Sequence, residues 1–95
     1  MNASDMNTPK DSTFTERQGQ FLAYIHLYSL VNGRAPAESD MREFFQITAP
    51  SVHSMVVTLE RLGLIRRVPG QARSITVLVA PESLPPLVRV NPNPQ

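Results

Sequence analysis

Apolar residues recur at helical spacing in the first third of the chain. Thr15 and Gln18 form a capping-box pattern and Asn32-Gly33 is a helix-stop signal, so a helix is expected from about Glu16 to Val31. Its apolar positions form a main face and a second group on nearly the opposite side: Phe21, Leu22, Ile25 and Tyr28 in the first, Ala23, Leu27 and Leu30 in the second. An ordinary surface helix has one apolar face, so the second group predicts a further contact.

Two shorter helices are expected next, around a tight turn. Glu38 and Asp40 suit the positive end of a helix that runs to about Phe45 or Gln46. In the turn, Thr48 or Ala49 is the expected N-cap, and Pro50 begins a helix that runs to about Leu62 and stops at Gly63. The predicted inward residues of this last helix are Val52, Met55, Val56, Leu59 and Leu62.

A β-hairpin is predicted after the helices. Leu64–Val68 and Ser74–Val79 are rich in Ile and Val and flank Pro69-Gly70-Gln71-Ala72. We call residues 64–79 the wing, and expect Ile65, Ile75, Val77 and Val79 to point inward. The predicted fold class is mainly α with a small β-hairpin: a winged helix–turn–helix, with three helices and a two- or three-stranded antiparallel wing.

The two ends of the chain lack this patterning. Residues 1–12 are polar and without periodicity, which predicts a disordered arm, and residues 81–95 form a Pro-rich tail. The folded domain is therefore expected at residues 13–80. Two alternatives would cover Leu27 and Leu30: a homodimer contact, or docking of the tail through Leu84, Leu87 and Val88.

Composition excludes several function classes. The chain has 95 residues and no cysteine, so it has no disulfide, thiol nucleophile or cysteine zinc site. No apolar run is long enough to cross a membrane and no signal peptide is present, so a cytoplasmic protein is expected. The two histidines lie on different predicted helices without an acidic cluster, which argues against a metal site. We predict no enzyme activity, no cofactor and no small-molecule ligand.

The distribution of charge is more informative than the net charge of +1. Between Arg61 and Val79 there are four arginines, namely Arg61, Arg66, Arg67 and Arg73, and no acid. Arginine suits bidentate contacts to phosphate, so these residues and Gln71 are the predicted contacts to the DNA backbone. Neutralising about 4 phosphates per subunit would make log K fall against log salt with a slope of about −3.6.

The exposed side of the last predicted helix carries small polar residues, which allow a helix to enter the major groove of double-stranded DNA closely. The candidate base-reading residues are Ser51, His53, Ser54, Val57 and Thr58. His53 is either a contact to a base or phosphate or a solvated helix histidine. Val57 either meets a thymine methyl group or is a scattered exposed valine.

Several motifs in order resemble the N-terminal DNA-binding domain of LexA-type SOS repressors. They are Thr15–Gln18, Ala35-Pro36-Ala37-Glu38, Pro50, Leu59 with Gly63-Leu64-Ile65, and Val68-Pro69-Gly70-Gln71-Ala72-Arg73-Ser74-Ile75. The resemblance covers about residues 14–79. It implies that the helix from Pro50 is the recognition helix and that the wing contacts DNA, in a small transcriptional regulator such as a repressor.

The chain also departs from those repressors. The distance from Pro50 to Gly63 is slightly shorter, so the base-reading candidates are taken from the helix face and not from the family. No Ala-Gly cleavage pair follows the wing, so self-cleavage is not carried over; a stand-alone relative and a fragment both fit the sequence. The competing function is a winged-helix module that binds another protein, which would carry apolar residues on the reading face or acids in the wing.

Overall fold

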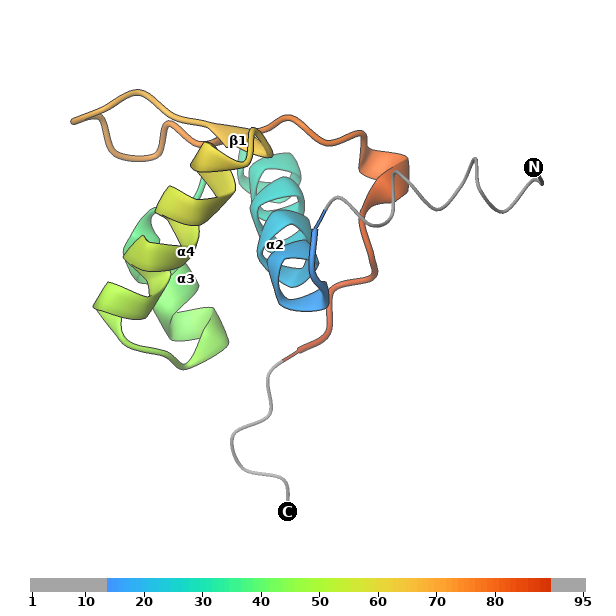
Figure 1. The fold of residues 1–95 in the computed structure, drawn as a ribbon, viewed down its shortest axis with the longest axis horizontal. Coiled ribbons are helices and arrows are strands. Elements are labelled where there is room, and N and C mark those ends of the chain that lie inside the picture. Colours follow the sequence, from blue (N-terminus) through green and yellow to red (C-terminus); the bar gives the residue numbers. More distant parts are fainter. Residues whose placement is uncertain (1–13, 90–95) are drawn as a thin grey trace, which may run out of the picture.

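The computed structural model describes residues 14–89, and the predicted arm at residues 1–12 lies outside this range. The described elements are α2 (Glu16–Asn32), α3 (Glu38–Phe45), α4 (Ala49–Arg61), β1 (Ile65–Arg66), β2 (Thr76–Val77) and a 3-10 turn, η1 (Pro81–Ser83). Figure 1 shows α3 and α4 on one side of α2, the wing above them, and the tail descending along the other side of α2. The architecture is the predicted winged helix–turn–helix.

The helix ends follow from local capping. Thr15 Oγ1 accepts from Gln18 N at 3.1 Å, and Gln18 Oε1 accepts from Thr15 N at 2.9 Å, so the predicted capping box is present. Gly33 ends α2 in the left-handed region at φ 73°. Thr48 caps α4 through its hydroxyl, which accepts from Ser51 N at 3.3 Å. The helices therefore begin and end within about one residue of the expected positions.

The core lies where α2 crosses α3 and α4. Phe21 of α2 stacks on Phe45 of α3 with ring centroids 4.1 Å apart and planes within 9°. From α4, Val52, Val56 and Leu59 are fully buried, as predicted. Leu62 was expected inward, and this prediction is wrong because its side chain is 47% exposed. The helix ends before it, and Gly63 at φ 78° turns the chain so that Leu64 and Ile65 enter the core instead.

The wing has shorter strands than the predicted Leu64–Val68 and Ser74–Val79. Ile65 pairs with Val77 and Arg66 with Thr76 in an antiparallel register. Beyond Arg66 the strand pairing ends because Ser74 Oγ accepts from Val68 N at 2.9 Å and donates to Val68 O at 3.3 Å, in place of a backbone ladder. Arg73, at φ 58°, also takes the chain out of extended geometry. Ile65 and Ile75 are buried, and Val77 and Val79 pack at the edge of the core.

The tail contacts α2 at Gln20, and not at the leucines that it was expected to cover. The Gln20 side chain donates from Nε2 to Pro86 O at 2.8 Å and accepts at Oε1 from Val88 N at 2.7 Å. Gly19 allows this approach, since an added Cβ would lie 3.0 Å from Pro85 Cγ. Leu84 packs against the core. The tail leaves Leu27 and Leu30 exposed by 40% and 70%, so it does not cover the residues proposed for it.

Replacement of Gln20 by alanine tests the docking. Both hydrogen bonds to the tail are lost, so we expect the Val88 amide to lose protection from hydrogen exchange, and the free energy of unfolding to fall by about 1 kcal/mol in urea titrations. In a chain truncated after Val79 the partners of Gln20 are absent, and the same substitution should then leave the stability unchanged. An equal loss in both chains would contradict the docked arrangement.

Candidate nucleic-acid interface

The exposed side of α4 has a defined centre. A helix turns by about 100° per residue, so Ser54 and Arg61 lie about two turns apart on the same side. Both are exposed. Ser51 and Thr58 flank this line on one side, and His53 and Val57 flank it on the other. The structure thus brings all five predicted base-reading residues and Arg61 onto one convex surface, which we call the α4 face.

A groove borders the α4 face on the side of α2. It has a volume of about 480 Å³ and is lined by Gln18, Pro50, Ser51, Ser54, Met55 and Thr58. Gln18 comes from the first turn of α2, and sequence reasoning assigned it only a capping role. No sequence signal links Gln18 to Ser54, because the juxtaposition arises from the crossing of α2 and α4.

An acidic side chain of α3, Glu38, lies beside the opposite margin of the α4 face. His53 Nδ1 lies 3.4 Å from Glu38 Oε2, across from the first turn of α3. Val57 is 40% exposed and is the one large apolar side chain exposed within α4. At the centre of the face, Ser54 has the small polar character expected of a helix that enters a groove, and Arg61 adds a positive charge. His53 lies at the edge of the face.

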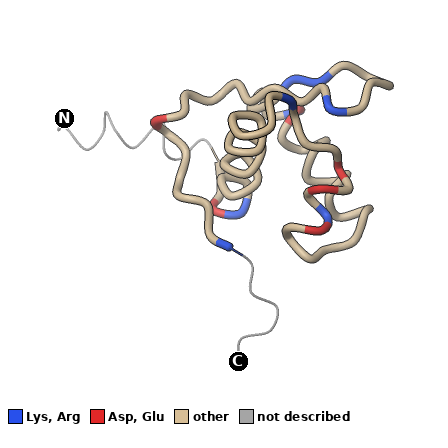
Figure 2. The backbone as a smooth tube through the Cα atoms, turned by 180° about the vertical axis from the view of Figure 1, so that it is seen from behind, with Lys and Arg blue, Asp and Glu red and all other residues tan. Residues whose placement is uncertain are grey.

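The four arginines of the wing region differ in their surroundings. Arg61 and Arg66 are exposed, and Gln71 is exposed at the loop. Arg67 Nε donates to Glu60 Oε1 at 2.9 Å, and its Nη1 lies 4.0 Å from Glu38 Oε2. Arg73 is likewise paired with an acid. Figure 2 shows the basic positions of the wing beside acidic positions on the neighbouring helices. The stretch from Arg61 to Val79 contains no acid, but Arg67 and Arg73 are paired with acids that come from α3 and α4.

Arg73 is directed toward the helices. Its Nη1 donates to Asp40 Oδ2 at 3.1 Å, to Tyr28 Oη at 3.1 Å and to Ala35 O at 3.3 Å. The same Asp40 carboxylate accepts from the backbone N–H of Ala37 at 2.8 Å, at the start of α3. The Ala37 hydrogen bond, followed by the nearby Arg73 charge, holds the pKa of Asp40 below its ordinary value.

The comparison with known families agrees with this geometry. A family model described as LexA DNA binding domain matches residues 11–74. The chain belongs to the LexA DNA-binding domain family. This domain is a non-catalytic fold that binds DNA sequence-specifically in a transcriptional regulator.

Between residues 14 and 89, no three His, Asp or Glu side chains gather into a group that could hold a metal ion. Within the same range, none of the helices combines the length and apolar character needed to cross a membrane.

The site residues that sequence reasoning missed are the partners of the arginines: Tyr28, Glu38, Asp40 and Glu60. Glu38 and Asp40 were noted only as favourable charges at a helix start. Tyr28 was assigned to a core face. Their second role depends on contacts between residues distant in sequence, which no local pattern reports.

The pKa of Asp40 predicts a pH-dependent stability. Because the folded-state pKa lies below the ordinary value of 3.8, the ionised carboxylate stabilises the fold above that value, and the stabilisation is lost as pH falls through the folded-state pKa. Asp40→Asn should therefore lower the urea midpoint at neutral pH, and the difference from the wild-type chain should vanish as pH falls below the folded-state pKa of Asp40. The exposed Glu82 is the control: Glu82→Gln should shift the midpoint little at any pH. A constant difference for Asp40→Asn would contradict the charge pairing.

Proposed function

We propose that this LexA-type domain binds an operator with α4 in the major groove and the wing on the DNA backbone or in the minor groove. The observation that carries the proposal is the α4 face, whose centre offers Ser54 and Arg61 without a bulky apolar side chain. A helix of about 10–12 Å diameter, side chains included, fits a major groove about 12 Å wide, and the small Ser54 allows a close approach at the centre of the face.

In this proposal the side chains of the α4 face divide into two roles. Ser51, Ser54 and Thr58 read base edges by hydrogen bonding, and Val57 contacts a thymine methyl group. His53 reads a base or phosphate at the margin near Glu38, which also draws it toward α3. Arg61, Arg66 and Gln71 contact the phosphate backbone, because their side chains are exposed.

The small size of this domain favours binding of two copies to one DNA site. One small module contacts too little DNA surface for tight, specific binding, so we propose two copies on a two-fold site. The exposed Leu27 and Leu30 of α2 are available for contact between copies, since the docked tail leaves them uncovered.

Salt dependence tests the backbone contacts. With Arg67 and Arg73 paired internally, Arg61 and Arg66 account for about 2 of the expected phosphate contacts per subunit, so their share of the slope of log K against log salt is about −1.8. Arg66→Gln should weaken binding to specific and random duplexes alike and reduce the slope by about 0.9 per subunit. Arg89→Gln is the charge-matched control, because Arg89 lies in the tail, in a groove with Glu16 and Arg17, on the side of α2 away from α4. A salt-independent Kd for the wild-type chain would favour the protein-binding alternative.

Selection from a random DNA pool tests the reading role of α4. We expect the wild-type chain to enrich a palindromic motif, because two copies present the same α4 face. Ser54→Ala should relax the preference at one position of each half-site by about 1 kcal/mol, roughly fivefold, and leave the salt slope unchanged. Enrichment of the same motif with the same stringency by both chains would remove Ser54 from the reading residues.

A further inference from the structure

The wing depends on side chains for its orientation. Its strands contain only two residues each, and the loop between them is held by the contacts of Ser74 to Val68. Such a short ladder stabilises a hairpin little by itself. The two paired arginines extend from either side of the loop, Arg67 to Glu60 of α4 and Arg73 to Asp40 of α3. Ion pairs therefore connect both arms of the wing to the helix–turn–helix.

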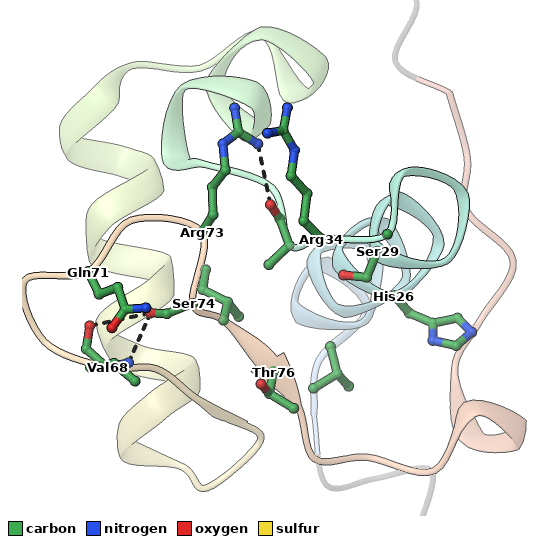
Figure 3. Close-up of a pocket in the computed structure, with 12 residues that line it drawn as sticks. His26, Ser29, Arg34, Val68, Gln71, Arg73, Ser74 and Thr76 are labelled. Carbon is green, nitrogen blue, oxygen red and sulfur yellow. Dashed lines mark hydrogen bonds between the residues drawn. The ribbon is translucent and has the colours of Figure 1, made fainter.

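The Arg73 contact is the more extensive of the two. One guanidinium nitrogen meets acceptors from α2, from the connector between α2 and α3, and from α3. Figure 3 shows the Arg73 side chain extending away from Gln71 at the loop, and its Nη1 donates to Ala35 O at 3.3 Å. The backbone of Arg73 is left-handed, with φ 58°. A non-glycine residue adopts that conformation at an energetic cost.

Asp40 makes this contact relevant to DNA binding. Its carboxylate accepts from Ala37 N at 2.8 Å, and its backbone carbonyl lies 3.5 Å from the hydroxyl of Tyr24, which donates to it. Asp40 thus caps the start of α3, the first helix of the helix–turn–helix, and also contacts α2 through Tyr24. Arg73 held by Asp40 sets the position of the wing relative to α4, the helix that the proposed function places in the major groove.

We infer that Arg73 is a positioning residue for DNA binding, clamped by Asp40 and Tyr28, and that it does not itself contact phosphate. This inference rests on the proposed function. To reach a phosphate, Arg73 would have to give up the Asp40 carboxylate at 3.1 Å together with two further acceptors, whereas the exposed Arg66 has no such acid within the described residues. The wing therefore contains two kinds of arginine, one that contacts DNA and one that holds the wing in place.

The substitution of Asp40 separates the two roles of Arg73 by the sign of its effect. If Arg73 positions the wing, Asp40→Asn releases the clamp and weakens DNA binding by about tenfold. If Arg73 contacts phosphate, Asp40→Asn frees its charge and removes a nearby negative charge, so DNA binding strengthens. We expect weakening, with Arg73→Gln equally weak and the double variant no weaker than either single variant.

The slope of log K against log salt provides a second readout. We expect Arg73→Gln to keep the wild-type slope, whereas Arg66→Gln reduces it by about 0.9 per subunit. Arg73→Lys keeps the charge but loses the planar guanidinium geometry, so it should bind as weakly as Arg73→Gln, while Arg66→Lys should bind nearly as the wild type. If Arg73→Gln does not fold, Arg73→Lys and Asp40→Asn decide the question. Amide exchange at Gln71 should increase in the Arg73 and Asp40 variants without DNA, and stay unchanged in the Arg66 variants.

The outcomes separate the inference from the proposed function. If the wild-type chain binds no duplex at low salt, the proposed function itself is wrong. If it binds, but Arg73→Gln reduces the slope by about 0.9 or Asp40→Asn tightens binding, the positioning role is overturned while the proposed function stands.

Discussion

The wing and the helices of this domain meet at one carboxylate. Asp40 accepts from the Ala37 N–H that starts α3, and it accepts from Arg73 of the wing. The relation between the helices and the wing depends on this junction, because the wing has only two-residue strands. An ion pair that is about one third exposed is weak by itself, but here it coincides with a helix cap and two further acceptors.

The hydrophobic core supplies the rigidity that this junction requires. Phe21 stacks on Phe45, and Val52, Val56 and Leu59 of α4 are fully buried. These contacts hold α3 and α4 against α2 and leave the α4 face free for DNA. The tail adds to the same scaffold from the far side of α2, through Gln20 and the close approach at Gly19. A small domain gains from such an added contact, since its single core buries a limited area.

Charge pairing changes how the wing is interpreted. The carboxylates of Glu38, Asp40 and Glu60 pair with Arg67 and Arg73, two of the four arginines in a stretch of sequence that has no acid. The chain thus places carboxylates beside the surface proposed to bind DNA, where they repel phosphates but fix the orientation of Arg67 and Arg73. Membership of the LexA DNA-binding domain family establishes DNA binding. The geometry adds a proposed division of labour among the arginines.

The sequence by itself determined the elements, because capping residues, glycine stops and apolar spacing act over a few neighbouring positions. Thr15, Gly33, Thr48 and Gly63 set helix ends close to where they were expected. The same patterns placed Ser54 and Arg61 on the exposed side of α4. Only the tertiary structure decided the partners of Arg67 and Arg73, the exposure of Leu62 and the docking of the tail on Gln20. Those features depend on which side chains converge from distant parts of the chain, and that convergence is fixed by packing and not by local sequence.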